Sequence, residues 1–267
     1  MAEMTLRYNC EALAGVNKPA EYKRDGDYYY VLLGALNVYN SENIFYMYNE
    51  SKHVFENSNI FMRKVRSGNL WGELDHPPLL PGMSEAEFIE RNEWIEITNT
   101  AFHIRDVDVI VTDETCDGEP VVEIWGWISP TGAAHGARLK AALDNPDMNV
   151  CFSLRAIVRE GVIRGRKCRR IDKLCTFDYV IEDGLKICNK YSAMTRGSKA
   201  AQESTRTFVS RAINPKALEQ ICNDPSALSS VARESSRAQV REYAKEYLGY
   251  LGAPRSLTVK GLGQERW

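Results

Sequence analysis

The chain lacks the features that would place it in several common classes of protein. Its 267 residues carry a formal net charge of only −2, so no strongly basic surface for bulk binding of nucleic acid is expected. The longest apolar runs are far too short to span a bilayer, and the first residues do not follow a basic start with an apolar stretch. These absences predict a cytoplasmic protein that binds neither nucleic acid nor a membrane.

Signatures of structural metal sites and of disulfide frameworks are absent as well. The seven cysteines are odd in number, form no C-x-x-C pair and have no histidine at a zinc-like spacing. We therefore expect reduced thiols, no metal and no other cofactor. One alternative stays open, in which Asp75 and His76 bind a metal together with other carboxylates of an unrelated β-barrel hydrolase or binding module.

Residues 25–190 are dominated by short stretches rich in Val, Ile, Phe, Tyr and Trp, separated by Gly, Asn, Asp or Pro. The strands predicted from them lie within residues 28–39, 53–65, 93–111, 120–128, 148–158 and 173–183. A helix is predicted among them at residues 132–145, where Leu139, Ala142 and Leu143 recur at helical spacing. The predicted fold class is therefore mainly β with helices, an α+β fold built on a barrel or sandwich.

The texture of the sequence changes near residue 196. From there the chain is rich in Ala, Ser, Arg and Glu, with helices expected at about 215–222 and 226–248. We predict a domain of residues 1–195 followed by a partly helical C-terminal tail of residues 196–267. The Ser-rich links of such a tail are typical sites of proteolytic cutting.

A histidine held in a stiff segment is the first candidate for a functional group. It lies in "WGELDHPPLLPG", residues 71–82, between an aspartate and two prolines. Proline fixes its own backbone and restricts the residue before it, so the main chain at His76 is confined before any tertiary contact forms. A plain surface turn is the alternative interpretation, because Asp, Pro and Gly are the ordinary turn residues.

Two further polar residues interrupt strongly apolar strand patterns. Ser153 lies in "NVCFSLRAIV" and shares its strand face with Arg155, two positions along. Asp178 lies in "CTFDYVIED", where a carboxylate needs a partner because Asp is seldom buried without one. That partner could be the imidazole of His76 or the guanidinium of Arg155 or Arg170. The three residues Ser153, His76 and Asp178 would suit a serine hydrolase, although no G-x-S-x-G motif supports that chemistry.

The order of these motifs resembles the prohead maturation proteases of tailed bacteriophages, of the T-even and giant-phage type. The resemblance covers about residues 35–185. "GELDHP" (72–77) is similar to the histidine motif of that family, "FSLRA" (152–156) to its serine-bearing strand, and "CTFDYV" (175–180) to its segment with an acidic residue. The family is related in fold to the herpesvirus assembly protease. The resemblance therefore implies a herpesvirus-protease-like β-barrel flanked by helices.

The resemblance also implies roles for individual residues. In a serine endopeptidase of this kind Ser153 is the nucleophile, His76 the general base and Asp178 the third member of the triad. His103 is the alternative third member, because the herpesvirus relatives use a second histidine. Arg155 is a candidate for stabilising an oxyanion or contacting substrate, and a simple ion pair is the alternative for it.

The partners implied by the resemblance are the scaffold or core proteins and the capsid proteins of a phage, cut inside the assembling prohead in the host cytoplasm. A homo-oligomer is also compatible with the resemblance. Proteases of this kind cut after glutamate, often with a small residue two positions earlier, and Glu203 and Glu234 are the self-cleavage sites predicted in the tail. The alternative function is a catalytically inactive core or scaffold protein that retains the protease fold.

Overall fold

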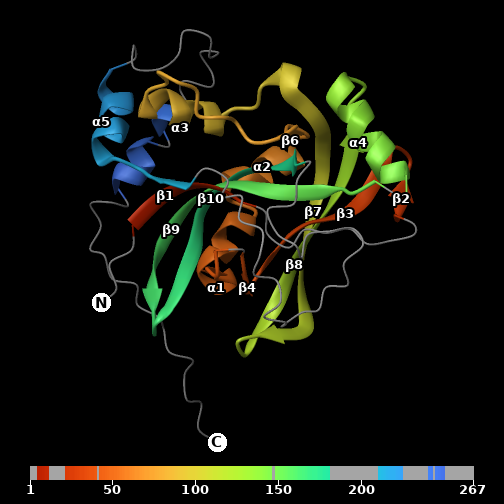
Figure 1. Cartoon of the computed structure of the whole chain (residues 1–267), viewed down its shortest axis with the longest axis horizontal. Helices are drawn as coiled ribbons and strands as arrows, with labels where there is room; N and C mark the ends of the chain where they lie inside the picture. Colours follow the sequence, from red (N-terminus) through yellow and green to blue (C-terminus); the bar gives the residue numbers. More distant parts are fainter. Residues whose placement is uncertain are drawn as a thin grey trace, which may run out of the picture.

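The computed structural model describes residues 5–11, 22–40, 42–145, 148–180, 210–224, 240–242 and 244–249. Within these residues the strands form two sheets (Figure 1). The larger sheet has the strand order β11-β1-β9-β10-β5-β4. Its strands are β1 (Thr5–Glu11), β4 (Val38–Tyr39), β5 (Phe45–Tyr46), β9 (Cys151–Ile163), β10 (Arg166–Val180) and β11 (Ser210–Ala212).

The smaller sheet has the strand order β2-β3-β8-β7-β6. Its strands are β2 (Arg24–Asp25), β3 (Tyr28–Leu36), β6 (Trp71–Glu73), β7 (Thr100–Cys116) and β8 (Glu119–Pro130). All its pairs are antiparallel, and in the larger sheet only β5 and β10 run parallel. An isolated bridge between Leu74 and Tyr179 joins the end of β6 to β10. The two sheets therefore meet near the C-terminal end of β10.

The two long hairpins follow from their turn residues. Asp117 and Gly118 connect β7 to β8, and Arg164 and Gly165 connect β9 to β10, all four with positive φ angles. A two-residue loop with positive φ at both positions matches the right-handed twist of the flanking strands and fixes their register. The β9–β10 register places Ser153 directly opposite Asp178.

The predicted α+β fold class is confirmed, but the described strands do not close into the expected barrel. The smaller sheet ends in β2 and the larger sheet in β4, and each of these edge strands is only two residues long. Edge strands this short offer too few backbone hydrogen-bonding groups to pair with a further strand and close a barrel. The main core lies instead between the two sheets, where it includes Phe102, Phe152 and Phe177.

Part of the predicted strand 53–65 is wrong, because that region is helical. It contains the end of a short 3-10 helix, η1 (Lys52–Phe55), which follows α1 (Tyr48–Ser51), and then α2 (Ile60–Arg66). The Asn59 side chain caps α2 by accepting a hydrogen bond from the amide of Phe61 (3.0 Å). Phe61 and Val65, four residues apart, face the main core. The aromatic and β-branched residues that favoured a strand are therefore the buried face of a helix.

The other helices complete the fold. The predicted helix 132–145 is confirmed as α4 (Ala134–Asp144) and the predicted helix 215–222 as α5 (Pro215–Asn223). Residues 240–242 and 244–249 are also helical, and all but the last of them lie within the second helix predicted for the tail, at about 226–248. The helix α3 (Glu85–Glu93) was not predicted, and a short 3-10 turn, η2 (Ile97–Asn99), follows it. None of the described helices is long and apolar enough to cross a membrane.

A second, smaller hydrophobic cluster, here called the outer cluster, covers the other face of the larger sheet. It joins α3, Ile157 of β9, α5 and the helical residues 240–242 and 244–249. Figure 1 shows α5 beside α3 at one end of the molecule. Its buried members are Ala86, Phe88, Ile89, Ile157, Ile213, Ala217, Leu218, Ile221, Val240, Ala244 and Tyr247.

Candidate active site

His76 lies where the chain leaves β6 and runs along the end of β10. The amide of Asp75 donates to the carbonyl of Tyr179 (2.8 Å), which ties this segment to β10. Asp75 has a φ of 62°, and its carboxylate accepts from the amide of His76 (2.9 Å). Aspartate tolerates this left-handed conformation because its short side chain bonds to nearby backbone. The turn read from the sequence is present, yet the His76 side chain is only 7% exposed.

Gly72 lets β6 approach β10 closely enough to hold this turn. A Cβ at Gly72 would lie 2.4 Å from the carbonyl oxygen of Phe177 and 2.2 Å from the ring of Phe102. A backbone oxygen at that distance leaves no room for any side chain. The glycine that opens "GELDHP" is therefore required by the close approach of β6 to β10, the strand that carries Asp178.

The structure brings His76, Ser153 and Asp178 into one chain of hydrogen bonds. His76 Nδ1 lies 2.8 Å from Asp178 Oδ2, and His76 Nε2 lies 2.6 Å from Ser153 Oγ. Ser153 and Asp178 face each other across the β9–β10 hairpin, while His76 reaches both from the turn after β6. His76 is 77 positions from Ser153 and 102 positions from Asp178 in the sequence, and the three side chains meet on one face of the larger sheet.

The protonation of Asp178 sets the direction of these hydrogen bonds. Burial alone would raise the pKa of this carboxyl, but the positive charge of Arg155 and the hydrogen bond from His76 outweigh burial and hold the pKa below its ordinary value. An ionised carboxylate only accepts hydrogen bonds, so Nδ1 of His76 carries the proton that it donates to Asp178. In the neutral imidazole Nε2 is then an acceptor, turned toward the hydroxyl of Ser153.

Arg155 holds the Asp178 carboxylate from the other side. Its Nε donates to Oδ2 (2.8 Å) and its Nη2 to Oδ1 (2.6 Å), a two-point contact that fixes the plane of the carboxylate. The amide of Glu73 adds a bond to Oδ1 (3.1 Å). Both oxygens of Asp178 are thus directed by donors at known positions, and neither Asp178 nor Arg155 is exposed to solvent.

Glu73 is a second buried carboxylate behind the triad. It lies 3.2 Å from Arg155 Nη2 and 2.7 Å from Arg91 Nη2, and it also accepts from the amide of Glu96 (2.6 Å) and from Asn99 Nδ2 (3.2 Å). With these partners a fully buried carboxylate is tolerated, since burial of a charge is costly only where it lacks them. Two carboxylates therefore share one guanidinium, and Arg155 is fixed between them.

Ser153 itself has no exposed surface. A serine that reacts with a peptide must touch the carbonyl carbon of that peptide. Any reaction of Ser153 with a peptide would therefore require the groups that cover its Oγ to move.

The remaining residues predicted for the site lie elsewhere or outside the described residues. Both ring nitrogens of His103 bond to other groups: Nδ1 is 3.0 Å from the hydroxyl of Tyr28 and Nε2 is 3.0 Å from the carbonyl of Gly68. Its ring also packs edge-on against Trp71. Glu203 and Glu234 lie outside the described residues.

Glu73 and Arg91 were not predicted from the sequence. A signal for Glu73 existed, because a glutamate between Gly72 and Leu74 in a strand-like stretch needs a partner for the same reason as Asp178. Arg91 lies on α3, which was itself missed. For the described residues, no group of three or more His, Cys, Asp or Glu side chains is placed to hold a metal ion.

Comparisons with known proteins show which family the chain belongs to. A family model described as the Peptidase S80 family matches residues 8–244 of the chain. The chain belongs to the peptidase S80 family. It is 31% identical over 189 residues to the capsid maturation protease of Pseudomonas phage phiKZ, and the match covers 68% of each chain.

A solved structure, that of the bacteriophage T4 capsid assembly protease, is also similar to this S80 peptidase. The sequence identity is 16% and the TM-score 0.45, and the match covers 67% of this chain and 98% of that one. The family match and the phiKZ relative confirm the predicted resemblance to the maturation proteases of tailed phages.

Proposed function

We propose that this S80 peptidase is a serine endopeptidase with Ser153 as nucleophile, His76 as general base and Asp178 as orienting carboxylate. The observation that carries the proposal is the chain of short hydrogen bonds from Asp178 through both nitrogens of His76 to Ser153 Oγ. A nucleophile, a base and an orienting group in mutual contact are the geometric requirement for this chemistry.

In the proposed reaction Ser153 Oγ attacks the peptide carbonyl while His76 Nε2 takes the hydroxyl proton. The imidazolium that forms is stabilised by the Asp178 carboxylate, and it returns the proton to the departing amine as the C–N bond breaks. Water then attacks the acyl-serine while it gives a proton to Nε2, the ester bond to Ser153 Oγ breaks, and Nε2 returns the proton to Oγ. The carboxylic acid product is released and free Ser153 is restored. Atoms and charges balance without any cofactor.

Arg155 acts in this proposal through Asp178. Its guanidinium already bonds to Asp178 and lies 3.2 Å from Glu73, so an oxyanion would have to compete with two buried carboxylates. We infer that Arg155 positions the triad instead of contacting the oxyanion. His103, whose ring nitrogens bond to Tyr28 and Gly68, is not part of the proposed triad.

For substrates we infer the scaffold or core proteins and the capsid proteins of a phage, cut inside the assembling prohead in the host cell. The phiKZ relative is a capsid maturation protease, which supports this class of substrate. We further infer cleavage after glutamate and self-cleavage after Glu203 and Glu234. Support comes from the tail, where most glutamates, including these two, have Ala or Gly two positions earlier.

The proposal is tested by intact mass spectrometry over time on the wild-type chain and Ser153→Ala, purified side by side. We expect the wild type to shorten at Glu203 or Glu234 and the variant to stay whole. If both shorten alike, a contaminating protease is responsible. If both stay whole with phage core proteins present as substrate, the inactive scaffold protein is the better description.

A further inference from the structure

The outer face of β9 connects the triad to the outer cluster. Ser153, Arg155 and Ile157 are alternate residues of this strand, so their side chains point to the same face of the sheet. Ser153 and Arg155 bond to His76 and Asp178, whereas Ile157 packs in the outer cluster. At about 3.3 Å per residue, roughly 13 Å of one strand separates the serine from that cluster.

The helix α3 forms a second connection. Its apolar residues Phe88 and Ile89 belong to the outer cluster. Its Arg91 bonds to Glu73 through both guanidinium ends (2.7 and 3.2 Å), and Glu73 in turn lies against Arg155. A shift of α3 therefore moves the Arg91 guanidinium that donates to Glu73. The Glu73 carboxylate, which helps to fix Arg155, moves with it.

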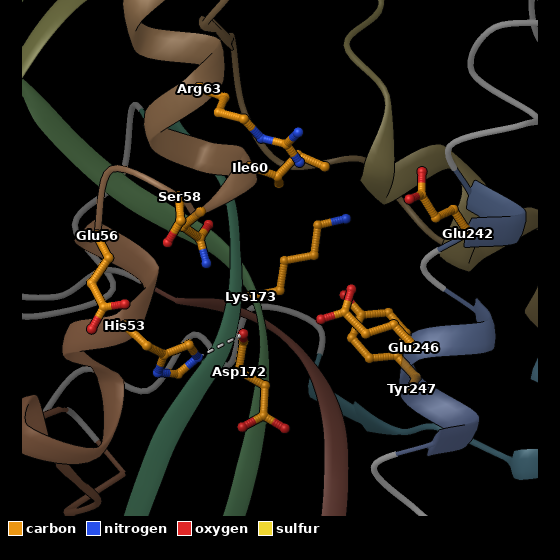
Figure 2. Close-up of a pocket in the computed structure, with 11 residues that line it drawn as sticks. His53, Glu56, Ser58, Ile60, Arg63, Asp172, Lys173, Glu242, Glu246 and Tyr247 are labelled. Carbon is orange, nitrogen blue, oxygen red and sulfur yellow. Dashed lines mark hydrogen bonds between the residues drawn. The ribbon is translucent and has the colours of Figure 1, made fainter.

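Lys173 gives α3 a third attachment, on the same side of the sheet. It is the cross-strand partner of Ile157, and its ammonium pairs with Glu93 at the end of α3. Lys173 also lines a cavity of about 310 Å³ together with Glu242, Glu246 and Tyr247 (Figure 2). Figure 2 shows Lys173 extending from β10 toward the space between α2 and these C-terminal residues.

The outer cluster is closed by the C-terminal segment, defined here as the described residues 213–224, 240–242 and 244–249. One polar bond attaches the segment to α3, since the amide of Asn214 donates to Glu85 at the start of that helix (2.9 Å). Another joins the two parts of the segment, since Arg241 donates to the carbonyl of Cys222 (3.1 Å). Its buried apolar residues are Ile213, Ala217, Leu218, Ile221, Val240, Ala244 and Tyr247. Without this segment the apolar faces of α3 and Ile157 would lie in water.

We propose that the C-terminal segment is a working part of the peptidase, which positions Asp178 by holding α3 and Ile157 in place. The inference rests on the proposed Ser153-His76-Asp178 chemistry. On this proposal the segment works together with the residues before 195, and its contacts in the outer cluster would keep it bound after a cut at Glu203. The planar guanidinium of Arg155 lies between two buried carboxylates. A displacement of that guanidinium by about 1 Å is enough to lower kcat by on the order of a hundredfold.

The test compares two full-length variants of α5, Leu218→Asp and Gln220→Asp. Leu218 is fully buried in the outer cluster, whereas Gln220 is exposed on the same helix, so the same new charge detaches the segment only in the first. Hydrogen exchange of α3 and α5 reports detachment. Proton NMR of the strongly deshielded Nδ1 proton of His76 reports the triad without requiring activity, and hydrolysis of a Glu-containing peptide reports turnover.

We expect Leu218→Asp to lose the deshielded proton signal and to lower kcat at least tenfold, while Gln220→Asp changes neither. Detachment of the segment with an unchanged signal would overturn the inference. If the wild type shows the signal but hydrolyses nothing, the proposed function fails and the positioning effect is still measured by NMR. The two proposals are thus separable.

A milder pair covers the case in which Leu218→Asp does not fold. Leu218→Ala and Arg91→Gln are made singly and together, and kcat is measured for each. If the segment acts through α3 and Glu73, the double variant loses less than the product of the two single losses. Independent, multiplicative losses would overturn the inference.

Discussion

The two faces of strands β9 and β10 are both buried, yet they are built from opposite chemistry. On the inner face Phe152, Leu154 and Phe177 pack in the main core. On the outer face Ser153 and Asp178 bond through His76, with Arg155 behind them. Apolar packing tolerates substitutions of similar volume, whereas directed bonds between buried charges do not. Alternate residues of one hairpin therefore place apolar packing on one face and the hydrogen-bonded polar groups of the proposed site on the other.

The largest effect is expected on the outer face, at the third member of the triad. Asp178→Asn should lower kcat about 10⁴-fold, because the amide favours the wrong tautomer of His76. His103→Ala is the matched comparison and should leave kcat within a few fold. Peptide hydrolysis by the two purified variants measures both. A larger loss in His103→Ala would move the third position of the triad to that histidine.

On the inner face a truncation should act on stability. Phe152 is fully buried and packs edge-on against Phe102, with ring centroids 5.3 Å apart. Phe152→Ala should lower the free energy of unfolding by about 3–5 kcal/mol, through lost burial and a residual cavity. Urea unfolding measures this, with Phe55→Ala at a partly buried position as control. A fully stable Phe152→Ala would mean that this face is not the core.

Arg155→Lys changes the outer face without changing its charge. Lysine offers a point charge in place of the two-point contact that fixes the Asp178 plane, so kcat should fall by about 10²-fold with little change in KM. Steady-state kinetics separates the two constants. A rise in KM at constant kcat would instead indicate that Arg155 contacts the substrate.

The smallest effect expected is on the pH dependence of stability. Arg155 and His76 hold the pKa of Asp178 below its ordinary value against the opposing effect of burial. A carboxyl with a depressed folded pKa stabilises the fold above its unfolded pKa of about 3.9, and this contribution is lost as pH falls through the folded pKa. The stability difference between wild type and Asp178→Asn should therefore shrink as the pH falls below about 3.9 and through the folded pKa. A difference that stays constant in urea unfolding curves would contradict this.

The same two faces show which parts of the structure could be predicted from the sequence. Alternation predicts which residues of β9 share a face, and helical spacing predicts α4 and α5, because these patterns are local. The strand prediction at 53–65 is wrong because aromatic and β-branched residues also form the buried side of α2. The helix α3 was missed although Ser84 and Glu87 form a capping box at its start.

The partners of the buried charges could not be read from local patterns. Glu73 meets Arg91 and Arg155 only because β6 leads alongside the end of β10 and α3 packs nearby. That arrangement depends on the order of strands in two sheets, which the sequence does not display. The sequence predicted the triad residues from their types and from a family resemblance, while Glu73 had to be found in the structure.

Covalent labelling of the full chain with a fluorophosphonate, followed by peptide mass mapping, tests the role of the outer face most directly. Such a reagent phosphonylates an activated serine, so we expect one adduct, on Ser153. Labelling should be slower by about 10²-fold or more in His76→Ala, which lacks the base, and unchanged in Ser67→Ala, an exposed serine control. An adduct on another serine, or equal labelling of wild type and His76→Ala, would contradict the assignment of Ser153 as the nucleophile.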